Sequence, residues 1–209
     1  MKIVHGSDPV RWWMVDRWCE PVGLGNLPSR VEGVWEARYD NDCEHGKRTT
    51  RTPPTLYGEV LRRLQTDQVR QEWSERLGYD LVHDETVHGG GLHVTDPGGW
   101  LNTHLDYDRH PGKPAFRRAI NFIAFLNPEW STSWGGNLQL CDPLGKAVTV
   151  IRPQPGRLFA FEVGDLAYHG VSKVTGDVPR VTIACYLLSA CKGHESRLRA
   201  LFMPTRGTS

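Results

Sequence analysis

Residues 98–106 read GGWLNTHLD and residues 118–127 read RAINFIAFLN, and these two runs decide the fold class. They lie in a half of the chain where short β-prone runs alternate with clusters of Gly, Pro and Asp, as in strands joined by tight turns. The turns fall at Asp-Pro-Gly-Gly (96–99), Asp-Pro-Leu-Gly (142–145) and Pro-Gly (155–156). Short strands at this spacing favour a β-sandwich, a barrel or a jelly roll. We predict strands over residues 86–94, 100–106, 119–126, 137–141, 147–151, 158–162 and 178–188.

The N-terminal part has a different pattern. Residues 55–77 carry apolar side chains at helical spacing, and Gly78 stands where such a helix would end. The Trp-rich run 10–19 indicates a short amphipathic helix, residues 31–40 alternate like a strand, and residues 41–54 are polar and turn-rich like a loop. No shift in composition divides the chain, so we expect one domain. We place its parts at 1–80 (N-terminal helical support region), 81–190 (β core) and 191–209 (C-terminal tail), within a single domain of 1–209.

Composition excludes several classes of protein. The 209 residues include 25 Lys and Arg against 24 Asp and Glu, and a net charge of +1 argues against a nucleic-acid partner held by bulk charge. No apolar run reaches the roughly 18–20 residues of a membrane helix, and charged residues interrupt residues 1–18, so we expect neither a membrane partner nor a signal peptide. Five cysteines, an odd number without C-x-x-C spacing, indicate reduced thiols and a cytoplasmic location.

Two of the nine histidines have a carboxylate two residues on, in His83-Asp84-Glu85 and in His104-Leu105-Asp106. In an extended strand, residues two apart point to the same face, so His104 and Asp106 could both reach one metal ion. His169, which arrives from a distant β-rich region, would complete two histidines and one carboxylate. That set leaves open positions on one side of the metal and is typical of non-heme Fe(II) oxygenases.

The order His104-x-Asp106, His169, Arg180-Val-Thr182 resembles that of the Fe(II)- and 2-oxoglutarate-dependent dioxygenases, in the prolyl 4-hydroxylase-like branch. The resemblance spans roughly residues 86–188 and includes GGWLNTHLD (98–106), RAINFIAFLN (118–127) followed by Trp130, GGNL (135–138) and PGRLFAF (155–161). It implies a double-stranded β-helix, or jelly roll, supported by the N-terminal helices, in an α+β, mainly β, chain. The jelly roll would be the catalytic core, and the activity implied is hydroxylation.

The resemblance also implies a cosubstrate site. In this family 2-oxoglutarate chelates the Fe(II) cofactor through its C1 carboxylate and keto oxygen, and its C5 carboxylate is buried and needs a cation. Arg180 can supply a planar, bidentate partner, and Thr182 shares its strand face and can add a hydroxyl. Phe125 stands where the branch often carries a Tyr, so the phenol donor is absent, and Thr182 could replace it.

Other residues are candidates for contacts with cosubstrate or substrate: His93, Asn102, Asn121 and Arg118. Each also has a structural explanation. His93 could be a strand histidine bonded to the backbone, and Asn102 and Asn121 could be polar residues on an outward face. Arg118 could be solvated or salt-bridged where a strand begins. The partners implied are dioxygen and a small-molecule or peptidyl substrate. Two other readings remain open: a cupin-like metal-binding jelly roll (isomerase, sugar-binding module or hydrolase), which would not need Arg180, and a metal-free interaction protein.

Overall fold

The computed structural model describes residues 2–19, 35–191 and 197–204, and these form a mainly β structure with two α-helices. The helices are α1 (Thr55–Leu64) and α2 (Asp67–Leu77), and a 3₁₀ turn spans Thr132–Trp134. The strands are β1 (Ile3–Gly6), β2 (Trp12–Val15), β3 (Ala37–Tyr39), β4 (Glu44–Thr50), β5 (Val82–His83), β6 (Gly91–Leu105), β7 (Phe116–Phe125), β8 (Leu138–Cys141), β9 (Ala147–Ile151), β10 (Leu158–Glu162), β11 (Tyr168–Val171), β12 (Arg180–Ala190) and β13 (Leu201–Phe202).

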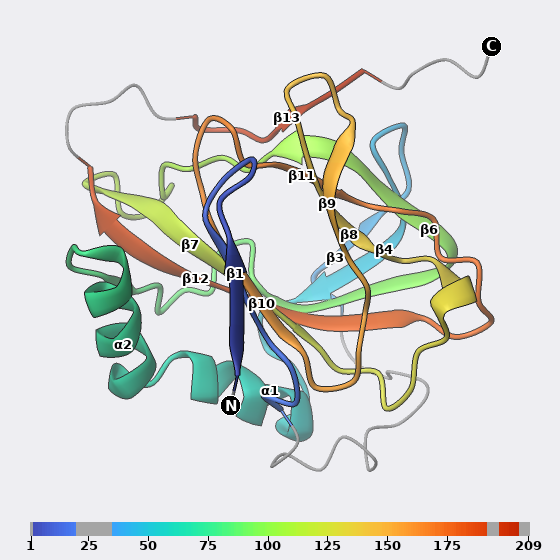
Figure 1. Ribbon diagram of the computed structural model, residues 1–209, viewed down its shortest axis with the longest axis horizontal. Helices are drawn as coiled ribbons and strands as arrows, with labels where there is room; N and C mark the ends of the chain where they lie inside the picture. Colours follow the sequence, from blue (N-terminus) through green and yellow to red (C-terminus); the bar gives the residue numbers. More distant parts are fainter. Residues whose placement is uncertain (1, 20–34, 192–196, 205–209) are drawn as a thin grey trace.

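The strands form one curled antiparallel sheet in the order β1-β2-β10-β7-β12-β6-β11-β8-β9, with β4 and β13 also paired to β6 (Figure 1). Apart from β1-β2 and β8-β9, neighbours in this order are not consecutive in sequence, as in a jelly roll, because long connections cross between the two halves of the sheet. The predicted fold class, a double-stranded β-helix supported by helices, is confirmed. The curled sheet is what gives the molecule an interior large enough for a site.

The helical expectation for residues 55–77 is confirmed, with one interruption. α1 ends at Leu64, and Thr66 caps α2 by accepting a hydrogen bond from the Val69 amide at 3.4 Å. Gly78 ends α2 in the left-handed conformation (φ 80°), which glycine adopts without steric cost. Both helices lie along one side of the curled sheet (Figure 1), and Leu64, Trp73 and Leu77 are buried in the same hydrophobic cluster as β7 and β12 residues.

Three local predictions were wrong. The run 10–19 contains strand β2 instead of a helix: its side chains alternate, so that Trp13 and Val15 join the helix-side cluster while Trp12 and Met14 pack on the other. The run 41–54 contains strand β4 instead of a loop, because its backbone pairs with β6 and its polar side chains suit the rim of the sheet. Part of the strand predicted over 31–40 lies outside the described residues, and β3 forms its last part.

The third error concerns the Asp-Pro-Gly-Gly run at 96–99, which is not a turn between two strands. It lies inside the 15-residue strand β6, which continues from Gly91 to Leu105. The pairing of β6 with β4 shifts register at this run, and Gly98 adopts a positive φ of 83° there. Its amide donates to the Val174 carbonyl at 2.8 Å. One strand therefore carries residues from the mouth of the barrel to the first predicted metal ligand.

Strand register determines which side chains face the interior. Thr182 on β12 lies opposite His93 on β6 and Phe125 on β7, and Arg180 lies opposite Thr95 on β6. Since directly paired residues project to the same face of an antiparallel sheet, these side chains form rows that line the barrel. The residues between them project to the opposite face, where Val181 and Ile183 join the helix-side cluster.

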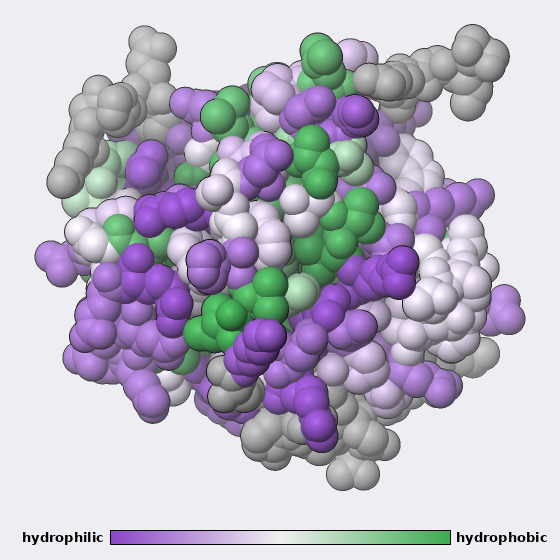
Figure 2. Space-filling model, viewed as in Figure 1, coloured by the Kyte–Doolittle hydropathy of each residue, from purple (hydrophilic) through white to green (hydrophobic). Residues whose placement is uncertain are grey.

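The outer surface is mostly polar, with apolar side chains gathered near the middle of the face in Figure 2. Exposed large apolar residues include Leu144, Val148 and Val150, which belong to β9 and the turn before it. Among the described residues, no helix is long and apolar enough to cross a membrane.

Candidate metal centre and active site

Two histidines and one aspartate converge at one end of the barrel interior. His104, at the end of β6, lies directly opposite His169 on β11, and their ring centroids are 4.2 Å apart. Asp106 follows β6 by one residue, with Oδ1 3.5 Å from His104 Nε2 and Oδ2 3.9 Å from His169 Nε2. The ligand atoms of all three residues lie within 4.8 Å of one another, so they could hold a single metal ion.

Both imidazoles are oriented in the same way. His104 Nδ1 donates to the Asn102 carbonyl and His169 Nδ1 donates to the Ala167 carbonyl, each at 2.9 Å. Because a carbonyl only accepts, each Nδ1 carries a proton, and Nε2 is the ring nitrogen that faces Asp106. Tethering the outer ring nitrogen to a backbone oxygen is how proteins orient histidine ligands.

The carboxylate of Asp106 is held by two further side chains. The Tyr186 hydroxyl donates to Oδ2 at 2.8 Å, and Asn121 Nδ2 donates to the same oxygen at 3.4 Å and to the tyrosine oxygen at 3.1 Å. Burial opposes ionisation of Asp106, but the neighbouring His169 and His104 hold its pKa well below the usual range. Burial lowers the pKa of His169 to about 4. At neutral pH the cluster therefore contains an ionised Asp106 carboxylate and a neutral His169 imidazole, the states in which these side chains bind metals.

A cavity of about 90 Å³ extends the site into the barrel, and Arg180 lines it together with the three converging residues. The side chain of Arg180 is buried: Nε donates to the Gly136 carbonyl at 2.8 Å, and Nη1 donates to Thr182 Oγ1 at 3.4 Å. No carboxylate of the described residues forms an ion pair with it. Burial lowers the pKa of Arg180 to about 10, so it stays charged at neutral pH without an anionic partner.

Phe125 lies beside this arginine, with its ring 5.1 Å from the guanidinium carbon. Thr182 is buried in the same row and its hydroxyl reaches the His93 carbonyl at 3.5 Å. The Thr182 hydroxyl therefore lies beside Arg180, where the sequence suggested that it could replace a phenol.

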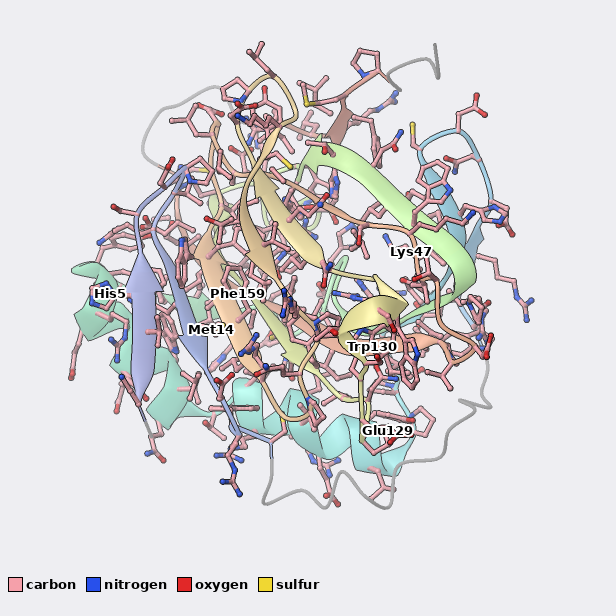
Figure 3. The ribbon with its side chains drawn as sticks, turned by 45° about the vertical axis from the view of Figure 1, so that its right-hand side comes forward. His5, Met14, Lys47, Glu129, Trp130 and Phe159 are labelled. Carbon is pink, nitrogen blue, oxygen red and sulfur yellow. The ribbon has the colours of Figure 1, made fainter. Side chains whose placement is uncertain are left out.

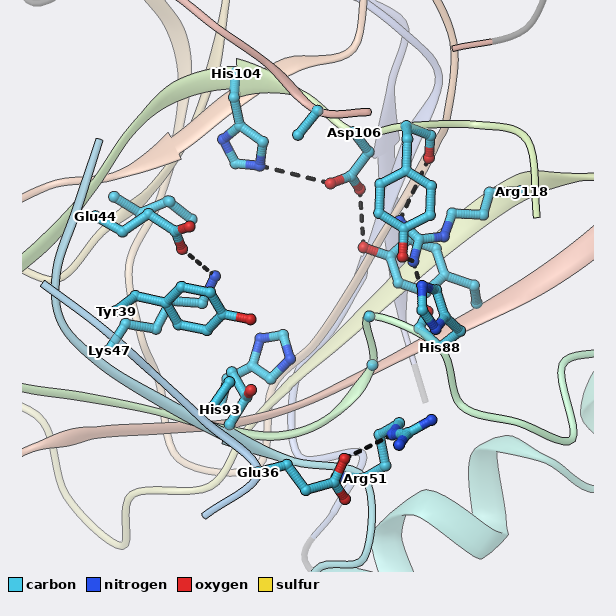
Figure 4. A pocket seen from close by; sticks show the side chains of 18 of the residues that line it. Glu36, Tyr39, Glu44, Lys47, Arg51, His88, His93, His104, Asp106 and Arg118 are labelled. Carbon is cyan, nitrogen blue, oxygen red and sulfur yellow. Dashed lines mark hydrogen bonds and ion pairs between the residues drawn. The ribbon is translucent and has the colours of Figure 1, made fainter. Parts of the chain in front are cut away.

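A second, outer cavity of about 480 Å³ opens beside the metal-binding candidates (Figure 4). Its rim on the β3–β4 side carries two ion pairs, Arg51 with Glu36 (2.7 Å) and Lys47 with Glu44 (2.6 Å). Lys47, labelled in Figure 3, lies on β4 beside β6 and lines both cavities. The rim charges are thus largely compensated within the protein.

Arg118 is the buried cation of the outer cavity. Its guanidinium lies 3.8 Å from the ring centroids of both Tyr107 and Tyr186. Nη2 donates to the His88 carbonyl (2.5 Å) and to the Tyr107 hydroxyl (2.6 Å), whereas Nε has no partner. A side chain on Gly89 would collide with Nη2, so this arginine has its place because residue 89 is a glycine with φ 72°.

The residues proposed from the sequence separate into three groups. His104, Asp106, His169, Arg180, Thr182, Asn121 and His93 line the inner cavity. Arg118 lines the outer one, which also includes His93. Asn102 lines neither: its amide donates to the Asp42 carbonyl at 3.1 Å, although its own carbonyl orients His104.

Burial and the charge of Lys47 lower the pKa of His93 to about 3, so this residue between the two cavities is neutral. The other His-x-acid pair of the sequence is elsewhere: His83 Nε2 lies 3.5 Å from Asp67 of α2.

Sequence reasoning missed Tyr186, Tyr107 and Phe202. Tyr186 lies on the same face of β12 as Arg180 and Thr182, so the alternation of side chains along the strand could have identified it. Nothing in the sequence near Phe202 indicates that it belongs to the site.

Comparison with known proteins agrees with this geometry. The family model described as the 2OG-Fe(II) oxygenase superfamily matches residues 90–188. No curated protein matches the chain. Among solved structures, a prolyl-4-hydroxylase of Pseudomonas putida is similar, with a TM-score of 0.60 at 18% identity over 87% of this chain and 93% of that one.

Two further solved structures share the fold. A prolyl hydroxylase of Trichoplax adhaerens, in complex with a hypoxia inducible factor oxygen degradation domain peptide fragment, has a TM-score of 0.58 at 20% identity over 84% of this chain and 82% of that one. The viral collagen prolyl hydroxylase of Paramecium Bursaria Chlorella virus-1, as its 2OG complex, has a TM-score of 0.56 at 16% identity over 88% and 99%. At these identities the likeness establishes the fold.

Proposed function

We propose that this chain, whose residues 90–188 belong to the 2OG-Fe(II) oxygenase superfamily, uses His104, Asp106 and His169 to hold iron and hydroxylates a C–H bond of its substrate. The chain is an Fe(II)- and 2-oxoglutarate-dependent oxygenase. The observation that carries the proposal for these residues is their convergence in a cavity that also contains Arg180, a buried cation with no acidic partner among the described residues.

The donor set fits Fe(II). Two neutral imidazole nitrogens and one carboxylate on one side of a cavity are the ligands of non-heme Fe(II) oxygenases, and they leave positions for other ligands. Asp106 supplies one negative charge, and Tyr186 and Asn121 fix its orientation through their hydrogen bonds to Oδ2. Both donors bind Oδ2, the oxygen nearer to His169, and Oδ1 accepts no hydrogen bond from the described residues.

The far end of the inner cavity fits 2-oxoglutarate. A dicarboxylate needs a cation away from the metal, and the guanidinium of Arg180 has unused N–H groups beside the Thr182 hydroxyl. The ring of Phe125 beside Arg180 and the apolar lining residues Ile123 and Leu138 exclude water there and strengthen the charge–charge interaction. When bound, Fe(II) and 2-oxoglutarate supply the chemistry that couples oxidative decarboxylation to insertion of oxygen into a C–H bond.

The outer cavity is where we place the substrate. Arg118 lines that cavity together with the aromatic side chains of Tyr107, Tyr186 and Phe202, which provide apolar surface. The substrate we propose is a small molecule or a peptidyl residue. The Trichoplax adhaerens protein with the same fold was solved in complex with a peptide fragment, which supports the peptidyl alternative.

Two measurements test the proposal. Fe(II) and 2-oxoglutarate are added without oxygen, and a weak visible charge-transfer band is expected; candidate substrates are then screened with oxygen for products heavier by one oxygen atom. Asp106→Ala is the control, and it should lose most of the product. A jelly roll that binds metal for another reaction would bind iron but show no band dependent on 2-oxoglutarate, which would contradict the proposal.

We also propose a cytoplasmic location. The five cysteines of the sequence are all unpaired in the structure, which supports a reducing compartment. Fractionation of cells that express the chain at its natural level tests this, and recovery outside the cytoplasm would refute it.

A further inference from the structure

The imidazole rings of the two histidines are each packed against a phenylalanine, but the two phenylalanines come from different parts of the chain. Phe161 of β10, which is fully buried, lies 4.9 Å from the His169 ring, centroid to centroid. Phe202 of β13 stacks on His104 at 5.0 Å with an interplanar angle of 25°. His104 is thus held on one side by a residue from the segment that sequence reasoning treated as a tail.

Strand β13 is fixed to the metal-binding end of β6. Phe202 lies opposite His104, Leu201 lies opposite Leu105, and the Met203 amide donates to the Thr103 carbonyl at 2.9 Å. The pairing places Phe202 on the cavity side, where it lines the outer cavity together with Ala200 and His104. Leu201 projects the other way and is 54% exposed.

Arg197 anchors the segment that leads into β13. Its amide donates to Asp108 Oδ1 at 2.6 Å, and its carbonyl accepts from the amides of Asp108 and Arg109 at 3.2 Å. Its guanidinium donates to the carbonyls of Asp106 (3.2 Å) and Gly164 (3.3 Å) and pairs with Asp165. One side chain therefore joins the segment after Asp106 to the loop that precedes β11, the strand of His169.

We infer that the C-terminal segment 197–203 is part of the active site, with Phe202 as a positioning residue for His104 and a wall of the substrate cavity, and with Arg197 as its anchor. The inference rests on the proposed function, because it assumes that His104 binds iron. The Asn102 carbonyl fixes one atom of the imidazole but leaves the ring free to swing about that bond, and the face of Phe202 limits this motion. The same ring covers the cavity side of the imidazole and restricts the access of water and of competing chelators.

The test compares Phe202→Ala with Leu201→Ala, a matched control on the same strand that faces away from the cavity. Each protein is loaded with Fe(II) and 2-oxoglutarate without oxygen, and the rate of iron removal by 2,2′-bipyridine is followed. Aromatic ring contacts are worth about 0.5–1.5 kcal/mol, so Phe202→Ala should lose iron about 2- to 12-fold faster than wild type. Leu201→Ala should lose iron at the wild-type rate, and Phe202→Leu, which keeps apolar volume without the ring, should be intermediate.

Equal rates for wild type and Phe202→Ala would overturn the inference, and so would equal acceleration by Phe202→Ala and Leu201→Ala, since that would show general loosening of the strand. Thermal unfolding of each variant is measured alongside, so that a rate change with an unchanged midpoint is assigned to positioning. A wild-type protein that shows no band with iron and 2-oxoglutarate would instead refute the proposed function, and the inference with it.

Arg197 is tested separately by hydrogen exchange. Arg197→Gln removes the guanidinium contacts, and Arg199→Gln is the control, because Arg199 is an exposed neighbour with no hydrogen bond in the described structure. Arg197→Gln should accelerate exchange at the amides of Asp108, Arg109 and Met203 and also accelerate iron removal, whereas the control should do neither. Unchanged exchange and iron removal in Arg197→Gln would overturn its role as the anchor.

Discussion

Replacement of Arg180 by alanine should weaken the binding of 2-oxoglutarate far more than it weakens the binding of iron. Arg180 is 4% exposed, its Nε donates to the Gly136 carbonyl, and its remaining N–H groups have no acidic partner among the described residues. Removing one member of a buried charge pair costs about 2–5 kcal/mol, which corresponds to an increase in Kd of about 30- to 4,000-fold. Arg180→Lys keeps the charge but not the planar fork, so its Kd should lie between those of wild type and Arg180→Ala.

The assay is an anaerobic titration of the Fe(II) protein with 2-oxoglutarate, followed by the visible band, together with a separate iron titration. Iron affinity should be nearly unchanged, because Arg180 contacts none of the three proposed ligands. A second check uses pH. Burial lowers the pKa of Arg180 to about 10, so affinity for the cosubstrate should be constant from pH 7 to pH 9 and fall as the pH passes about 10.

An unchanged Kd in Arg180→Ala would refute the assignment, whatever happens to turnover. Equal loss of iron and 2-oxoglutarate affinity would also contradict it, since that result would indicate collapse of the barrel and not loss of a carboxylate partner. Far-ultraviolet circular dichroism of the variant separates the two outcomes.

Three further predictions can be tested independently. Asp106→Ala should lose most of the hydroxylation and retain iron less well in a chelator competition, and wild-type product formation in this variant would show that Asp106 is not a ligand. Gly89→Ala should lower the free energy of unfolding by about 1–3 kcal/mol more than Gly78→Ala does. Both glycines have a positive φ, but only at residue 89 would the new methyl group collide with Arg118. Equal urea midpoints for the two variants would contradict this prediction. His93→Gln should reduce the loss of stability between pH 6.5 and pH 3. The pKa of His93 is lowered to about 3 in the folded protein, so as the pH falls the unfolded chain takes up the proton first, which costs up to about 1.4 kcal/mol per pH unit. Parallel curves of stability against pH for variant and wild type would contradict this prediction.

The site is more predictable from sequence than the fold around it. Alternation along strands was sufficient to put Arg180 and Thr182 on one face, and it would have put Tyr186 there too. The pairing of His104 with His169 could not be derived from local pattern, because it depends on the register of β6 against β11, and β11 was not predicted as a strand. The order of the motifs along the chain suggested His169 as the partner, and the resemblance to a known family supported that choice.

Errors occurred where local pattern and tertiary pairing compete. The Trp-rich run 10–19 has aromatic residues on both faces, which in isolation also suits a helix, and only its pairing with β1 and β10 makes Trp12–Val15 a strand. The Asp-Pro-Gly-Gly run has strong turn residues but is held in β6 by neighbouring strands. Phe202 is the extreme case, since nothing near it in sequence indicates that its ring would lie on His104.

The central claim is tested most directly by anomalous diffraction at the iron edge, on crystals grown without oxygen in the presence of Fe(II) and 2-oxoglutarate. We predict one iron peak bound by His104 Nε2, Asp106 and His169 Nε2 at about 2.0–2.2 Å, by analogy with other nitrogen and oxygen donors. Density for 2-oxoglutarate should run from that peak to the guanidinium of Arg180. A peak at His83 and Glu85 with His104 unliganded, or a cosubstrate carboxylate remote from Arg180, would contradict the account.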